Sequence, residues 1–93
     1  MNRFLVTYDL VGTDESSADY ARLIDKIKGY STWGKVQKSV WLIKTVDSAT
    51  EVRDHLLKSM DSNDRLFVIT VTGTAAWRKT ICDTEWLKRF LTS

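Results

Sequence analysis

The alternation of strand-like and helix-like segments constrains this 93-residue chain more than any other feature of its sequence. Arg3 to Asp9 is rich in β-branched and aromatic residues, which predicts a strand. After a polar loop, apolar residues recur with a period near 3.6 from about Ser17 to Lys28, which predicts an amphipathic helix with Ser16 or Ser17 as its N-cap and Gly29 at its exit. The apolar stripe of this helix consists of Tyr20, Leu23, Ile24, Ile27 and Tyr30.

Three more segments have the composition of strands. Val40 to Ile43 is a clear strand, and Trp33 to Gln37 predicts a shorter one that pairs with it through a tight turn or bulge near Lys38. Arg65 to Thr72, which follows a turn and ends before a glycine, is the most strand-like segment of the chain.

Two more helices are expected between and after these strands. Ser48 and Glu51 stand at the spacing of a capping box, which predicts a helix from about Ala49 to Met60. Thr84 to Leu91 predicts a short closing helix. The inner face of the helix that begins at Ala49 is expected to consist of Ala49, Val52, Leu56 and Met60.

This order, β-α-β-β-α-β followed by a helical tail, is the pattern of the ferredoxin-like plait. Both crossovers are long enough for right-handed helical connections between parallel strands. We therefore expect an α+β fold with one ferredoxin-like domain over residues 1–93, of which 74–93 form the tail.

The predicted strands are apolar at consecutive positions, so both faces of the sheet are expected to be apolar. The two crossover helices of this fold cover only one face. The tail can cover part of the other, and a second subunit packed sheet against sheet is expected to cover the rest, because exposed patches of that size are rare on monomers. The tail residues that would contribute are Trp77, Trp86, Leu87 and Phe90.

Composition excludes several classes of protein. No apolar run approaches the roughly 20 residues that cross a bilayer, and the first residues lack the features of a signal peptide, so no membrane partner is expected. A single cysteine, Cys82, allows no internal disulfide and fits a cytoplasmic location. With one cysteine and one histidine, a structural zinc site is not expected.

The net charge of +2 is unevenly distributed along the chain. Residues 33–46 carry three lysines and no acid, and residues 74–93 also have more basic than acidic side chains. A solvated face is the ordinary explanation, and a nucleic-acid footprint is the alternative. The residues that would contact RNA or DNA in the alternative are Lys35, Lys38, Arg78 and Lys79.

Asp9 is the strongest single candidate for chemistry, because it ends a buried strand where a loop begins. A carboxylate there can bind Mg²⁺ through oxygen with water completing the shell, and two copies across a dimer axis would form a paired-acid site for phosphodiester cleavage. A strand-end aspartate that accepts backbone hydrogen bonds is the structural alternative. Ser39 could contact a phosphate oxygen, or be a small hydroxyl beside a bulge.

Other reactive or stacking side chains carry weaker signals. His55 has no partner at a catalytic spacing, and Cys82 has no motif around it. The four tryptophans could stack on bases, but core or dimer packing is the stronger interpretation for all of them: Trp41 lies inside a strand, and Trp77 and Trp86 stand at amphipathic spacing.

Two segments resemble the CRISPR-associated protein two (Cas-two) superfamily: Phe4-Leu5-Val6-Thr7-Tyr8-Asp9-Leu10, and Val36-Gln37-Lys38-Ser39-Val40-Trp41. A strand ending in Tyr-Asp and a later Gln-x-Ser-Val-aromatic segment recur there. The SinR-like group of small Cas-two-like proteins is more similar still. That closer similarity lies in residues 39–43, 52–54, 61–69 and 86–88.

The resemblance implies a ferredoxin-like homodimer with metal-dependent RNA or DNA cleavage or a structural role in spacer integration; related VapD-type toxins are ribonucleases. The metal-binding aspartate of the family corresponds to Asp9, and the serine of its Gln-x-Ser segment to Ser39, so both are assigned to the catalytic site. The chain departs from the family after Asp9, where many members have a basic cluster and residues 12–17 here are acidic.

Two functions follow as hypotheses. One is a Cas-two-like homodimeric, Mg²⁺-dependent endonuclease for RNA or DNA, linked to nucleic-acid defence or toxin function. The other is a non-catalytic dimeric module of the same fold that binds a protein partner.

Overall fold

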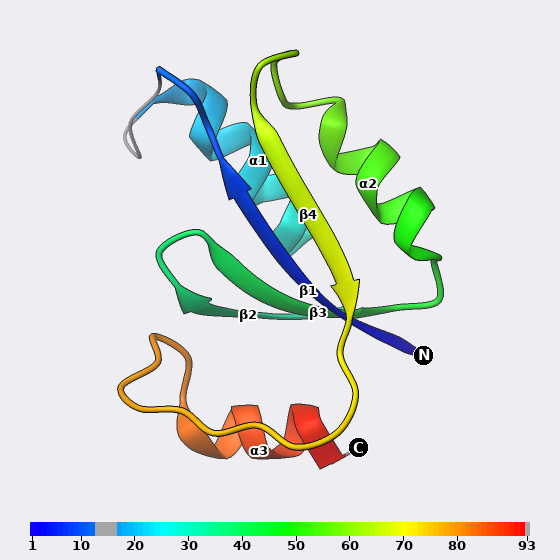
Figure 1. Cartoon of the computed structure of the whole chain (residues 1–93), viewed down its shortest axis with the longest axis vertical. Coiled ribbons are helices and arrows are strands. Elements are labelled where there is room, and N and C mark those ends of the chain that lie inside the picture. Colours follow the sequence, from blue (N-terminus) through cyan, green and yellow to red (C-terminus); the bar gives the residue numbers. More distant parts are fainter. Residues whose placement is uncertain (13–16, 93) are drawn as a thin grey trace.

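A computed structural model of the chain describes residues 1–12 and 17–92. These residues form an α+β structure with one four-stranded antiparallel sheet and three helices (Figure 1), which confirms the expected α+β class. The elements in chain order are β1 (Asn2–Asp9), α1 (Ala18–Lys28), β2 (Thr32–Gln37), β3 (Val40–Thr45), α2 (Ala49–Leu57), β4 (Arg65–Thr70) and α3 (Thr84–Thr92).

The strands lie in the order β2-β3-β1-β4, and every neighbouring pair is antiparallel. It follows that β1 runs parallel to β2 and β3 runs parallel to β4. Each of the helices α1 and α2 therefore connects two parallel strands that are separated by one antiparallel strand. Strands β2 and β4 form the two edges of the sheet.

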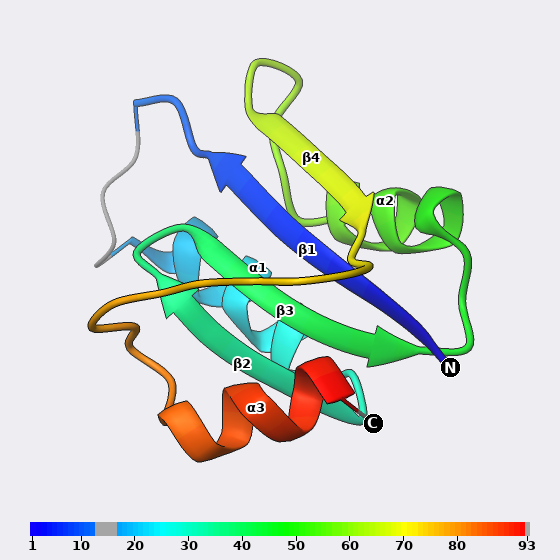
Figure 2. The same ribbon diagram turned by 60° about the horizontal axis from the view of Figure 1, so that its bottom comes forward.

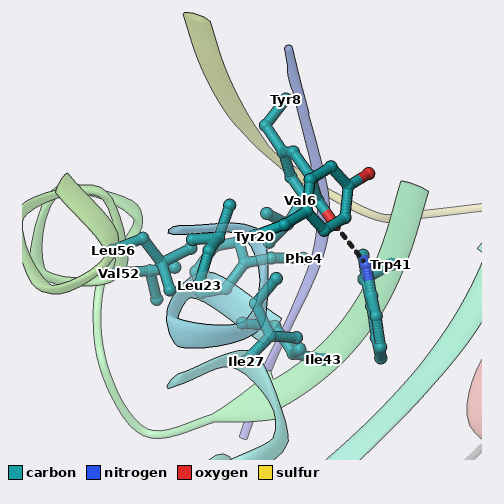
Figure 3. Packing of buried hydrophobic residues seen from close by; sticks show 10 residues of the cluster. All are labelled: Phe4, Val6, Tyr8, Tyr20, Leu23, Ile27, Trp41, Ile43, Val52 and Leu56. Carbon is teal, nitrogen blue, oxygen red and sulfur yellow. Dashed lines mark hydrogen bonds between the residues drawn. The ribbon is translucent and has the colours of Figure 1, made fainter. Parts of the chain in front are cut away.

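Helices α1 and α2 cover one face of the sheet, which we call the inner face (Figures 1 and 2). Strand β1 alternates as a half-buried strand should, with Phe4, Val6 and Tyr8 buried against these helices. Trp41 is 1% exposed, and its Nε1 donates a hydrogen bond to the hydroxyl of Tyr8 at 3.0 Å (Figure 3). The paired Nε1–H of Trp41 removes the cost of burying an unsatisfied donor in this core.

The tail crosses the opposite, outer face and places α3 there, so a second cluster forms around Leu42, Leu87 and Phe90 (Figure 2). The guanidinium of Arg3 holds the end of α3, because its Nη1 donates to the carbonyl oxygen of Leu91 at 2.7 Å. A cation at this point also interacts favourably with the negative end of the helix. The expectation that the tail covers part of the second sheet face is confirmed.

The predicted termini of the elements agree closely with the structure, with three exceptions. Strand β3 continues to Thr45 rather than ending at Ile43. Ser17 is the N-cap of α1, and its hydroxyl accepts a hydrogen bond from the N–H of Tyr20. Helix α2 ends at Leu57 rather than at Met60. Strand β4 ends at Thr70 rather than at Thr72. The N–H of Val71 still bonds to the carbonyl of Arg3, but the chain then leaves the sheet toward Gly73, whose φ is +81°.

Replacing Ser48 with alanine should lower the free energy of unfolding by about 1 kcal/mol. The Ser48 hydroxyl accepts from the N–H of Glu51 at 3.1 Å, and the Glu51 carboxylate accepts from the N–H of Ser48 at 2.9 Å. Alanine removes the first bond of this capping box and leaves the second. Urea unfolding measures the change, and Ser62→Ala, in the exposed turn before β4, is the control that should leave stability unchanged.

Candidate functional site on the outer sheet face

Asp9 lies at the end of β1 and on the outer face of the sheet. Its register partner on β4 is Arg65, and the two side chains approach to 4.0 Å between Asp9 Oδ2 and Arg65 Nη1. Both side chains are more than 70% exposed. An ion pair this exposed contributes little to stability. The same exposure leaves the carboxylate of Asp9 accessible to a ligand.

Directly opposed residues in an antiparallel pair share a face, so the register of β1 and β4 groups further side chains with Asp9. Phe67 and Ile69 are 58% and 47% exposed, which is unusual for large apolar side chains on a strand. We call this group the outer-face strip. It consists of Leu5, Thr7, Asp9, Arg65, Phe67 and Ile69.

A shallow cavity of about 130 Å³ opens beside Asp9 and has Arg65 and Phe67 among its lining residues. Within residues 1–12 and 17–92, no group of three or more histidine, cysteine, aspartate or glutamate side chains is arranged to hold a metal ion. Mg²⁺ needs only one or two protein carboxylates when water fills the remaining positions. One chain therefore offers a single carboxylate ligand on the strip, and a second would have to come from another copy.

Ser39 lies at the same end of the sheet but on the other face. Its carbonyl accepts from the N–H of Tyr8 at 3.3 Å, which places it next to the end of β1. Its Oγ lies 2.9 Å from the hydroxyl of Tyr20 on α1, on the inner side. The hydroxyl of Ser39 and the carboxylate of Asp9 therefore do not converge on one site within a chain.

The four basic candidates gather near the β2 edge. Lys35 lies on β2 with its Nζ 5.7 Å from the ring centroid of Trp41, and Lys38 lies in the turn that follows. The N–H of Ile81 bonds to the carbonyl of Val36 at 3.0 Å, which brings the loop that contains Arg78 and Lys79 to this edge. The two basic segments of the sequence thus meet in space at the β2 edge, whereas Asp9 lies on β1 and faces the β4 edge strand.

The two remaining candidates lie away from Asp9. His55 is exposed on α2 with its ring 6.0 Å from that of Tyr30, and partial burial together with Lys26 and Lys58 lowers its pKa. Burial and the charge of Asp47 raise the pKa of the Tyr30 hydroxyl. Cys82 packs partly against the cluster under α3.

Sequence reasoning missed Arg65 as a partner of Asp9. Asp9 ends one predicted strand and Arg65 begins another, which was the available signal. Their pairing, however, depends on the register of two strands that are distant in the sequence. The acidic segment expected after Asp9 falls on residues 13–16, which lie outside the described residues.

Among the described residues, no helix is long and apolar enough to cross a membrane. A scan against protein-family models finds no match for the chain, and a search of solved structures also finds none.

Proposed function

We propose that the protein is a Cas-two-like homodimer whose two copies pack through the outer-face strip, and that the Asp9 carboxylates serve a metal-dependent endonuclease activity on RNA or DNA. The strand order β2-β3-β1-β4 and the two helical connections between parallel strands support the finer assignment to a ferredoxin-like plait. The motif that ends in Tyr8-Asp9 supports the family assignment.

The observation that carries this proposal is the exposure of Phe67 and Ile69 beside Asp9. Helix α3 covers the β2–β3 half of the outer face and leaves the β4 half open. A two-fold interface is self-complementary, so the same apolar strip on a second copy is a suitable cover for it. A two-fold axis near the Asp9 end of the strip would bring the Asp9 carboxylates of both copies to one site.

Each residue of the strip has a task in this proposal. Asp9 from each copy would supply oxygen ligands to Mg²⁺, which when bound activates water and stabilises charge on a phosphodiester. The guanidinium of Arg65 places a positive charge beside the carboxylate and would contact a phosphate oxygen of the substrate. Phe67 and Ile69 would exclude water from the interface around this site.

The Phe67→Asp variant should be a folded monomer under conditions in which the wild-type protein is a dimer. The side chain is exposed on an edge strand, so the change costs the single chain little, whereas two buried carboxylates at a two-fold interface would repel each other. Sedimentation velocity measures the change. Val46→Asp, at an exposed apolar residue outside the strip, is the matched control and should remain dimeric. A Phe67→Asp protein that stays dimeric would show that the dimer interface lies outside the outer-face strip.

A second candidate function is a non-catalytic dimeric module that binds a protein partner. The specific observation in its favour is that Asp9 is the one acidic residue of the outer-face strip and has Arg65 beside it. In this case the pair orients the interface, and no metal is required. The cleavage experiment described in the Discussion separates the two functions.

A further inference from the structure

An open groove of about 330 Å³ lies at the β2 edge of the sheet, far from the outer-face strip. Trp33 and Gly34 of β2, Ile81 of the tail loop and Trp86 of α3 are among its lining residues, so the groove exists only because the tail packs against β2. Its volume falls within the range of sites for small organic groups. Most of its surface is apolar and aromatic.

Trp33 differs from the other tryptophans of the chain. Its residue is 39% exposed, whereas Trp41 is 1% exposed and both Trp77 and Trp86 pack against the cluster under α3. The Trp33 ring lies 5.9 Å from the Trp41 ring, tilted by 55°, so the buried indole supports the exposed one. Trp33 opposes Ile43 and Lys35 opposes Trp41 in the β2–β3 register, so both side chains lie on the inner-face side of the β2 edge, whereas Trp86 packs against Gly34 on the outer-face side. The support from Trp41 therefore fixes an aromatic surface at the β2 edge, beside the groove.

Positive charge surrounds this aromatic surface. The Nζ of Lys28 lies 5.3 Å from the centroid of the Trp33 ring, and Lys35 lines the groove. Arg78 and Lys79 are exposed three and two residues before Ile81, whose N–H bonds to β2. The acidic lining residue, Asp83, is engaged at the start of α3, where its Oδ2 accepts from the N–H of Trp86 at 3.4 Å.

We propose that the β2 edge beside this groove binds single-stranded nucleic acid, with one base packed against Trp33 and the flanking phosphates near Lys28 and Lys35. A supported, exposed indole beside lysines is the combination that holds unpaired bases, because every base has an aromatic face and every nucleotide a negative charge. The bases of a duplex are stacked on one another, so their faces cannot reach Trp33. The occupant is therefore a single strand.

This site is independent of the proposed catalytic function. It lies at the β2 edge, whereas Asp9 lies beside β4, and it needs neither a metal ion nor a second copy. A monomeric Phe67→Asp protein should bind the strand as the wild-type protein does. Failure of the dimer or of cleavage would thus leave this proposal standing, and the reverse also holds.

The test is fluorescence anisotropy with a labelled single-stranded RNA of about ten nucleotides, in chelator so that no metal-dependent cleavage occurs. Trp33→Ala should weaken binding by about tenfold. Trp33→Phe keeps a ring against Trp41 and should weaken binding by less. Lys35→Gln should lower the slope of log affinity against log salt concentration by the amount expected for about one phosphate contact. Lys58→Gln, at the end of α2, is the matched control and should bind like the wild-type protein.

Thermal unfolding of each variant checks that the fold is kept, and if Trp33→Ala is unfolded the Phe variant decides. Binding that is unchanged in both Trp33 variants overturns the proposal. So does a duplex of the same length that binds as tightly as the single strand, because the contact would then be with phosphates alone. Equal binding of a polyglutamate peptide assigns the groove to an acidic protein partner and also overturns it.

Discussion

The Asp9→Asn variant is expected to lose nearly all metal-dependent cleavage and to unfold at the same temperature as the wild-type protein. Asparagine keeps the shape of the side chain but removes the negative charge that binds Mg²⁺. The fold should not change, because the side chain is 71% exposed and its ion pair with Arg65 is long. The measurement uses labelled single-stranded RNA and duplex DNA with Mg²⁺, with Mn²⁺ and with chelator.

Asp54→Asn is the matched control, since Asp54 is an exposed aspartate on α2 that pairs with the neighbouring Arg53. It should cleave like the wild-type protein. Cleavage that survives in Asp9→Asn, or that continues in chelator, would contradict the assignment of the site. If no substrate is cleaved with either metal, the non-catalytic interaction module replaces the endonuclease as the proposed function.

Replacing Gly34 with alanine is expected to lower the free energy of unfolding by about 1–3 kcal/mol and to displace α3. A Cβ at this position would overlap three atoms of the Trp86 indole ring. That ring is stacked on Phe90 at a centroid distance of 5.2 Å, so it cannot move without disturbing the cluster under the tail. Urea unfolding measures the loss.

A double-mutant cycle provides the control for this prediction. Trp86→Ala alone removes packing and should also destabilise the protein. In the Trp86→Ala background, however, the added methyl group has free space, so Gly34→Ala should cost much less than it does in the wild-type protein. An equal cost in both backgrounds would show that the conformation of Gly34, rather than contact with Trp86, sets the requirement for glycine.

Local sequence signals predicted most of the secondary structure because they act within one turn or one strand. The capping box at Ser48 and Glu51 and the N-cap at Ser17 involve residues three apart, and both are present. The consecutive apolar residues of the strands predicted two buried faces, and α3 does cover part of the second one. Such features need no knowledge of how distant segments pair.

The candidate site was harder to predict because it depends on long-range register. Asp9 and Ser39 both stand near the same sheet end, and a one-residue difference in position decides which face each side chain takes. The register shift between Lys35 and Gln37 further obscures the alternation in β2. The bond between Ile81 and Val36, which gathers the basic residues at one edge, has no local signal at all.

The central proposal is that the exposed apolar strip beside Asp9 is covered by a second copy of the chain. Static light scattering of the wild-type protein at micromolar concentration tests it most directly, because it gives the mass without any assumption about shape. The proposal predicts a mass of twice 10.7 kDa that is independent of salt, since apolar burial rather than surface charge holds the copies together. A mass of 10.7 kDa over this range would contradict it.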